Sequence, residues 1–278
     1  MSESRRALVL GGGGVAGIAW ETGVLAGLAD GGVDVTTADR IIGTSAGSTV
    51  AAQITSGLSL PDLLARQSDP ALQSPELPPG DISMEELWAR FQQISESALD
   101  PAGQRREIGA LALGAETVSE ARRREVIEAR LPVHDWPRRD LVIVALDAHT
   151  GEPRLFGPDS GVGLVDAVAA SCAVPGVWPC VTIDGARYMD GGVRAATNAD
   201  LAAGFDRVLV LAAMPDLGEP SWARLEGTVE VIEPDQASLT AFGANPLAPE
   251  TRTPSAEAGY AQGRAAAPKV AVAWNDQA

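Results

Sequence analysis

The stretch that decides the fold is "ALVLGGGGVAGIAWETGVLAGL", residues 7–28. Its apolar start, residues 7–10, has the length and composition of a short buried strand. Four consecutive glycines, residues 11–14, then favour a tight turn. Beyond the turn, apolar residues recur at the spacing of a helix. These residues are Ile18, Val24, Leu25 and Leu28. The stretch therefore predicts a strand, a tight loop and a helix.

A second unit of the same kind follows in the chain. "DRIIG", residues 39–43, has the form of a short strand. A turn at Thr44 and Ser45 leads into a predicted helix over residues 46–58. Two such units in succession predict a parallel sheet with helices packed on its faces.

Later stretches extend the predicted sheet. "DLVIVALDA" (140–148) and "DRVLVLAA" (206–213) are apolar strands, and "EPRLFG" (152–157) follows the first of them. A helix is expected at "GLVDAVAASCA" (163–173), and "CVTIDGARYMDGG" (180–192) has the form of a hairpin that ends in a turn. The expected fold class is α/β with a mainly parallel central sheet.

The segment over residues 59–81 has a different composition. It contains five prolines among polar residues, so regular structure is not expected there. Helices are predicted at 83–94 and 119–131, where runs of arginine and glutamate fit solvated faces with i,i+4 pairs. A further alanine-rich helix is expected at 255–267.

The length of 278 residues fits one large α/β domain. We therefore expect a single domain over residues 1–278. Within it, residues 59–117 are interpreted as an insertion or cap-like region that leaves the sheet. Residues 215–278 are interpreted as a C-terminal extension that packs against the rest.

The charge balance bears on the partners. The chain has 21 basic and 37 acidic residues, a net charge of −16. This charge opposes the counterion release that drives binding to nucleic acid, so a nucleic-acid partner is not expected. It also opposes electrostatic docking on an anionic membrane, but it leaves room for transient membrane-surface contact through an apolar lid. The sequence does not determine the oligomeric state.

Metal-binding residues are few. Cys172 and Cys180 form neither a disulfide framework nor a zinc motif, and His134 and His149 are the two histidines of the chain. We therefore expect no metal and no cofactor.

The N-terminus resembles the start of a signal peptide, because Arg5 and Arg6 precede an apolar run. The glycines interrupt that run, and a glycine-rich segment favours a turn over a signal helix. The uncharged run 167–183 is too short to span a bilayer and contains Pro175 and Pro179. The expected location is cytoplasmic.

Ser45 lies in the pattern GxSxG, which runs from Gly43 to Gly47 between a predicted strand and a predicted helix. In this context a strained turn exposes a serine hydroxyl, and small flanking residues prevent a clash. Serine is also a frequent helix N-cap. On the motif alone, a nucleophile and an ordinary cap are equally supported.

The glycine run allows two functions. Gly12, Gly13 and Gly14 follow the first strand and could present backbone N–H groups to an oxyanion. Gly12, Gly14 and Gly17 also satisfy the dinucleotide pattern GxGxxG. That pattern needs an acidic residue at the end of the second strand, where this chain has Gly43-Thr44-Ser45. No GK[ST] closes the run as a P-loop would require.

A serine nucleophile needs a base. His134 or His149 would serve in a triad, but in that fold the serine turn follows several strands, and here it follows the second. The other candidate is Asp190 in "YMDGG", where Gly191 and Gly192 allow a tight turn that leaves the carboxylate projecting. Taken alone, "DGG" is more typical of a hairpin or loop turn than of a catalytic base.

Together, "GGGGVAG", "GTSAG" and the distant "DGG" resemble the patatin-like phospholipase family in order and spacing. The similarity extends from about residue 7 to residue 192. It implies a three-layer α/β/α fold and metal-independent hydrolysis of lipid acyl esters by a Ser45–Asp190 dyad. It also implies an oxyanion hole from the amides of residues 12–14, with Gly43, Gly47, Gly191 and Gly192 supporting the two turns.

The chain departs from the family pattern at two positions. Ala16 stands where the family usually has a basic residue, and Asp200 stands where it often has a proline. Loss of the cation motivates an alternative, a catalytically silent lipid- or acyl-binding protein. A dinucleotide-binding protein is the third possibility. Trp88 and Phe91 fit either an apolar lid over an acyl chain or ordinary core packing.

Overall fold

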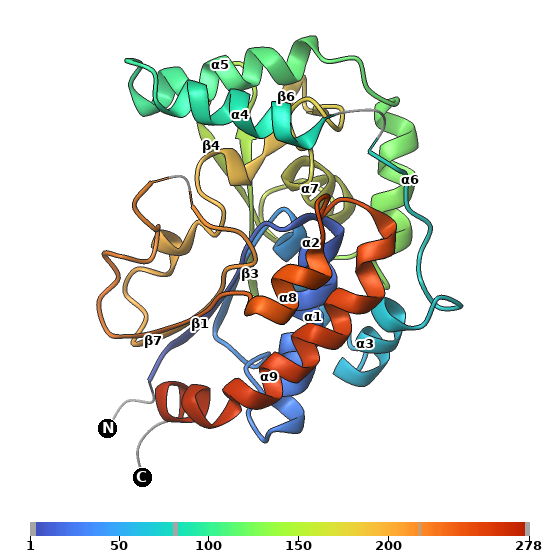
Figure 1. Ribbon diagram of the computed structural model, residues 1–278. Coiled ribbons are helices and arrows are strands. Elements are labelled where there is room, and N and C mark those ends of the chain that lie inside the picture. Colours follow the sequence, from blue (N-terminus) through green and yellow to red (C-terminus); the bar gives the residue numbers. More distant parts are fainter. Residues whose placement is uncertain (1–3, 80–82, 217, 276–278) are drawn as a thin grey trace.

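The computed structural model describes residues 4–79, 83–216 and 218–275, and within them a single sheet of eight strands runs through the centre (Figure 1). The strand order is β5-β6-β3-β2-β1-β7-β8, with β4 paired to β3. The strands are β1 (Arg6–Leu10), β2 (Arg40–Thr44), β3 (Asp140–Asp147), β4 (Pro153–Phe156), β5 (Val181–Ile183), β6 (Ala186–Asp190), β7 (Arg207–Leu211) and β8 (Thr228–Ile232).

The five strands β3, β2, β1, β7 and β8 are parallel, and β4, β5 and β6 pair antiparallel. Leu10 is in register with Gly43, so the turns after β1 and β2 emerge side by side at the carboxyl edge of the sheet. Ala145 of β3 is in register with Asp190, which brings the end of β6 to the same region. The predicted mainly parallel α/β sheet is confirmed.

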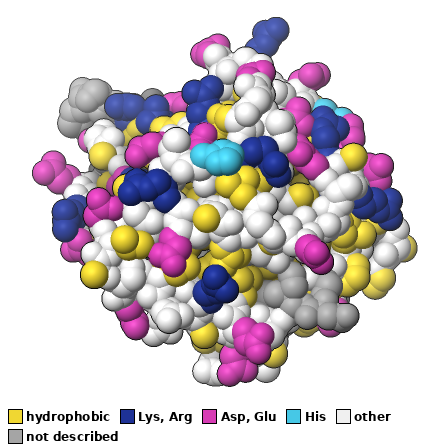
Figure 2. All heavy atoms as spheres, turned by 90° about the horizontal axis from the view of Figure 1, so that it is seen from above, with side chains coloured by type: hydrophobic (Ala, Val, Ile, Leu, Met, Phe, Trp, Pro, Cys, Tyr) yellow, Lys and Arg dark blue, Asp and Glu magenta, His cyan; other side chains and the backbone are white. Residues whose placement is uncertain are grey.

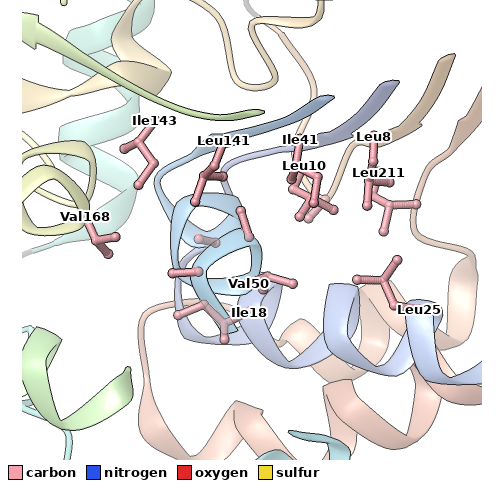
Figure 3. Close-up of a cluster of buried hydrophobic side chains, with 14 of the residues drawn as sticks. Leu8, Leu10, Ile18, Leu25, Ile41, Val50, Leu141, Ile143, Val168 and Leu211 are labelled. Atoms are coloured by element: carbon pink, nitrogen blue, oxygen red, sulfur yellow. The ribbon is translucent and has the colours of Figure 1, made fainter. Parts of the chain in front are cut away.

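The helices α1, α2 and α7 pack on one face of the sheet, and α9 packs along α1. Alternate strand residues such as Leu8, Leu10 and Leu211 point from the sheet toward these helices (Figure 3). The helices are α1 (Gly14–Asp30), α2 (Ala46–Ile54), α3 (Leu60–Ser68), α4 (Met84–Ser95), α5 (Pro101–Gly114), α6 (Glu120–Arg130), α7 (Leu164–Ser171), α8 (Gln236–Phe242) and α9 (Arg252–Trp274).

Helices α1 and α9 approach closely because glycines line their contact. A Cβ atom added at Gly23 would lie 2.3 Å from the carbonyl oxygen of Ala256, and one added at Gly27 would lie 2.2 Å from that of Tyr260. These separations are far below van der Waals contact, so side chains at both positions would force the helices apart. Backbone therefore packs directly on backbone here.

The other strand residues, among them Val9, Ile42 and Val210, face the opposite side of the sheet. There they are covered by residues of the short 3-10 helix Ala199–Ala202 and by Phe205. Helices α4 and α5 lie across the upper end of the molecule in Figure 1, over a separate apolar cluster. The sheet is thus covered on both faces, and its carboxyl edge lies beneath α4 and α5.

One sequence prediction is wrong, because the segment 59–81 contains the regular helix α3. Ser59 caps this helix by accepting a hydrogen bond from the Asp62 N–H, and Pro61 lies in its first turn. Proline is tolerated there because the first-turn N–H groups have no intrahelical partner. Residues 80 and 81 of the predicted segment lie outside the described residues.

The predicted helix 119–131 is confirmed as α6, but its charged residues are not all solvated. Arg124 forms the expected exposed i,i+4 pair with Glu128. Arg123 and Arg130 are instead buried, with side chains 7% and 6% exposed. Their seven-residue spacing places them on the buried face of α6 with Val126 and Ile127.

Other elements were not predicted, or differ in extent. Helices α5 and α8 and strand β8 were not predicted. Helix α2 ends four residues before its predicted end, and α9 is longer than predicted at both ends. No helix among the described residues has both the length and the apolar character needed to cross a bilayer.

Candidate active site

Ser45 lies on the turn between β2 and α2, with φ 52° and ψ −116°. A non-glycine residue at positive φ is strained, and such strain is typical of a serine held on a sharp strand-to-helix turn. The Ser45 side chain makes no capping hydrogen bond to α2, so the ordinary N-cap interpretation is wrong. A Cβ atom at Gly47 would lie 2.1 Å from the Leu10 carbonyl oxygen, which explains the small residue beside the serine.

The partner of Ser45 is Asp190, at the end of β6. The Ser45 Oγ–H donates to Asp190 Oδ2 at 2.6 Å, and the Gly192 N–H donates to Asp190 Oδ1 at 2.8 Å. A Cβ atom at Gly191 would lie 2.4 Å from the Val144 carbonyl oxygen, so the turn after Asp190 requires glycine. The two residues that were candidates for nucleophile and base are therefore in direct contact.

Asp190 is 5% exposed. Burial raises the pKa of its carboxyl from 3.8 to about 6, against the opposite effect of the hydrogen bonds from Ser45 and Gly192. A carboxylate with this pKa is largely ionised at neutral pH and is a stronger base than a solvated aspartate. It is suited to accept a proton from the serine hydroxyl.

The main chain of Ser45 is held by residues that the motifs did not single out. The Ser45 N–H donates to Ser171 Oγ at 2.9 Å, and Ser171 Oγ–H donates to the Val144 carbonyl at 2.6 Å. Ser48 Oγ–H and Cys172 Sγ–H both donate to the Ser45 carbonyl. The available signal was Ser171, a polar residue at the apolar end of helix α7, followed directly by Cys172.

The glycine loop borders the same pocket, but its amides are not equivalent. The Gly12 N–H donates to the Ala196 carbonyl at 2.8 Å, so it is already used. Among the described residues, no partner accepts from the N–H groups of Gly13 and Gly14. Below the loop, the fully buried Glu21 accepts from the Gly11 N–H at 2.8 Å, and burial raises its pKa well above the ordinary value. Glu21 supports the loop from inside.

A cavity of about 280 Å³ opens on Ser45 and Asp190. Helices α4 and α5 contribute apolar walls through Trp88, Phe91 and Ile108. Residues 246–247, from the predicted C-terminal extension, close another side. The cavity offers an apolar space beside a hydroxyl and a carboxylate.

The other candidates of the sequence analysis fall into two groups. Trp88 and Phe91 line the cavity. His134 and His149 do not line it; His134 lies near Glu128 on α6, and His149 follows β3 on an exposed turn. A histidine-based triad with Ser45 is therefore not formed.

The geometry also bears on cofactors. The Ala16 N–H, at the start of α1, donates to the Pro246 carbonyl, and a Cβ atom at Gly14 would lie 2.8 Å from that same oxygen. The end of α1 that would hold a pyrophosphate is therefore covered by the chain itself. Within the described residues, no three His, Cys, Asp or Glu side chains are grouped so that they could hold a metal ion.

The fold and the site define a mixed α/β protein with a serine on the strand-to-helix turn at the carboxyl edge of a mainly parallel sheet. The sequence pattern described as patatin-like phospholipase matches residues 8–203, and the chain belongs to this family. Members of the family are generally lipid acyl hydrolases. The predicted family and fold class are thus confirmed.

One solved structure supports this assignment of the fold, and a second is reported beside it for its similarity alone. VipD from Legionella pneumophila superposes with a TM-score of 0.50 at 15% identity, over 96% of this chain and 67% of VipD. The type III effector ExoU gives a TM-score of 0.35 at 17% identity, over 94% of this chain and 54% of ExoU. The chain thus spans about two thirds of VipD and about half of ExoU. Comparison with curated proteins gives no match.

Proposed function

We propose that the chain is a serine acyl hydrolase that cleaves lipid acyl esters, of the phospholipase, lysophospholipase or esterase type. The observation that carries this proposal is the 2.6 Å hydrogen bond from Ser45 Oγ to Asp190, at the floor of an apolar cavity. Family membership supports the same reaction class. The apolar walls fit an acyl chain, as the lid interpretation of Trp88 and Phe91 requires.

In the proposed reaction, Asp190 accepts the hydroxyl proton as Ser45 Oγ attacks the ester carbonyl carbon. The N–H groups of Gly13 and Gly14 oppose the charge that develops on the carbonyl oxygen. Asp190 then protonates the leaving alcohol, and the acyl group remains on Ser45. Asp190 next deprotonates a water molecule, which attacks the acyl-enzyme and releases the carboxylic acid. No metal or cofactor takes part.

A fluorophosphonate probe, read by mass spectrometry, tests the assignment of the nucleophile. We expect Ser45 to take the label in the wild type, and Ser45→Ala to lose both the label and the turnover of nitrophenyl esters. Asp190→Asn is expected to lower kcat/KM about 10²–10⁴-fold. Ser160→Ala, a half-buried serine outside the cavity, serves as the matched control and should behave as wild type. Wild-type turnover by Ser45→Ala, in a preparation free of other esterases, would contradict the proposal.

The pH profile tests the base. Because Asp190 must be ionised to accept a proton, and its pKa is about 6, kcat/KM for an uncharged ester should fall as the pH drops through about 6. Below that point the decrease should approach tenfold per pH unit. A profile that stays flat between about pH 5 and about pH 7 would exclude Asp190 as the titrating base.

A second candidate function is a catalytically silent acyl-binding protein, favoured by Ala16 in place of the family's usual cation. It predicts saturable fatty-acid binding in the same cavity without labelling of Ser45 and without turnover of any ester. The probe experiment therefore separates the two candidates.

A further inference from the structure

A second, smaller cavity of about 20 Å³ adjoins the main one. The two share lining residues, among them Gly14, Ser45 and Leu247, so they meet at the serine. The small cavity is lined on its far side by Arg123 and Arg130 of α6. The small cavity is therefore lined by the proposed nucleophile and by two guanidinium groups.

The arginines belong to a buried cluster with an excess of positive charge. Among the described residues, Arg123, Arg130 and Arg252 all lie within ion-pair distance of one carboxylate, Glu76. All four side chains are at most 7% exposed. Three cations against one anion leave a formal charge of +2, and buried charge is costly unless it is compensated.

The ionisation of the cluster follows from its pKa values. Burial acts to raise the pKa of Glu76, but attraction by Arg130 and Arg123 outweighs it and lowers the pKa to about 2. Burial lowers the pKa of Arg123 to about 10, with repulsion from Arg130 acting in the same direction. Both groups are therefore charged at neutral pH.

Arg123 also has an unused hydrogen-bond donor. Its Nη1 donates to Glu76 at 2.8 Å, while its buried Nε has no acceptor among the described residues. The guanidinium carbon lies 3.8 Å from the centroid of the Trp178 ring. An aromatic face attracts a cation but does not replace a lone-pair acceptor. This unsatisfied donor adds to the cost of the uncompensated positive charge that lies next to the small cavity.

We propose that the small cavity is an oxyanion-binding subsite, in which Arg123 and Arg130 receive an anionic oxygen of a phosphate monoester carried by the alcohol part of the substrate. The inference rests on the proposed function and specifies its substrate class, acyl esters of phosphorylated alcohols. A volume of about 20 Å³ holds one water-sized group, so it admits an oxygen atom of the anion while the rest of the head group lies in the main cavity.

The subsite supplies from α6 the positive charge that the family places next to the glycine loop, where this chain has Ala16. The outer surface does not provide the same selectivity. The face above α4 and α5 mixes basic and acidic side chains with apolar ones (Figure 2). Preference for an anion must therefore come from the buried arginines rather than from attraction by this face.

Steady-state kinetics on the whole chain test the proposal, with 1-acyl-glycerol 3-phosphate and monoacylglycerol of the same acyl chain as the pair of substrates. We expect wild-type kcat/KM to be at least about tenfold higher for the phosphate ester, since one charged contact contributes a factor of this size. Arg123→Gln should lower the ratio of the two kcat/KM values through a higher KM for the phosphate ester. Arg124→Gln, the exposed neighbour paired with Asp166, should retain the preference.

Inorganic phosphate distinguishes a free anion from a head group. If the subsite also binds the free anion, phosphate should inhibit the wild type competitively and should inhibit Arg123→Gln at least about fivefold more weakly. Equal inhibition of the wild type and of Arg123→Gln would overturn the assignment of Arg123. Equal wild-type kcat/KM for the two esters would overturn the subsite, and this comparison needs no variant to fold. If the two kcat/KM values are equal but Ser45 takes the probe and neutral esters are cleaved, only the subsite is rejected. If Ser45 takes no label and no ester is cleaved, the proposed function itself is rejected.

Discussion

The side chains of Asp190 and Glu76 are both almost completely buried, yet the pKa values of their carboxyl groups are shifted in opposite directions. Asp190 has a pKa raised to about 6, while Glu76 has a pKa lowered to about 2. Burial opposes ionisation in both cases, so the neighbours account for the difference. Asp190 receives hydrogen bonds from a hydroxyl and an amide, whereas Glu76 faces three guanidinium groups.

The comparison shows two uses of a buried carboxylate. With neutral partners, Asp190 keeps its affinity for a proton, which a general base requires. With cationic partners, Glu76 holds its charge at all ordinary pH values and cannot exchange protons with a substrate. Glu76 instead fixes the arginines beside the small cavity. The proposed base and the proposed anion subsite thus each depend on a buried carboxylate, one with neutral partners and the other with cationic partners.

The largest expected effect comes from removing the charge of Glu76. Glu76→Gln leaves three buried arginines without their shared anion and should lower the free energy of unfolding by about 3–5 kcal/mol. Because the folded pKa is lowered, this stabilisation is present above the ordinary pKa of 4.5 and is lost as the pH falls through about 2. Urea unfolding at neutral pH measures it.

Glu128→Gln provides the matched control, since Glu128 pairs with Arg124 on the exposed face of the same region. Its loss should cost less than about 0.5 kcal/mol. If both variants lose the same stability, the buried cluster contributes no more than a surface pair, and the contrast with Asp190 fails.

A smaller effect of opposite sign is expected at Asp190. Its folded pKa is raised from 3.8 to about 6, so the stability that this group contributes is fully present below 3.8 and is lost as the pH rises through about 6. Asp190→Asn removes the cost of burying the charge and should raise the free energy of unfolding by about 2 kcal/mol at pH 7.

The same variant should show no gain at about pH 4, where Asp190 is protonated in the folded state. Asp159→Asn, on an exposed turn, should change stability by less than about 0.5 kcal/mol at either pH. Thermal or urea unfolding at the two pH values measures the difference. A loss of stability at pH 7 would show that the carboxylate stabilises the turn more than its burial costs.

The smallest effect is expected at Glu21, which has no cationic partner among the described residues and whose pKa is raised by burial well above the ordinary value. Glu21→Gln keeps an acceptor for the Gly11 N–H and introduces no change of charge if the native carboxyl is protonated. We expect a change of about 1 kcal/mol or less in unfolding free energy, and wild-type labelling of Ser45. A loss as large as that of Glu76→Gln would mean that Glu21 is ionised.

Much of the sheet follows from local sequence patterns, whereas the pairing of Ser45 with Asp190 was implied by the family resemblance. The two strand–turn–helix units are contiguous in the chain, and the register of β1 with β2 places their turns together. The distant Asp190 was found because "DGG" accompanies the other two motifs in a known order. Each of these motifs specifies the functional residue and also the glycines that its turn requires, so the motif predicts both the side chain and the local backbone conformation.

The arginine cluster was not predicted, because its four members come from residues 76, 123, 130 and 252. The arginines of α6 were interpreted as solvated, although Arg123, Val126, Ile127 and Arg130 share the i, i+3, i+4, i+7 spacing of a buried face. The prediction of a solvated face used the charge of these residues and did not use their positions on the helix. Helix α3 was not predicted for a similar reason. Pro61 was interpreted as a residue that prevents a helix, although proline is compatible with the first turn, where it lies.

The backbone contact between α1 and α9 also has a consequence for the order of folding. The two helices lie about 220 positions apart along the chain, and contacts of such sequence separation form slowly because a long loop must first be closed. The Pro246 carbonyl accepts from the Ala16 N–H, and Pro246 and Leu247, which precede α9, border the cavity. Strands β1 and β7 are separated by a similar length of chain, so activity should appear late in refolding, once both long-range contacts have formed and residues 246–247 complete the cavity.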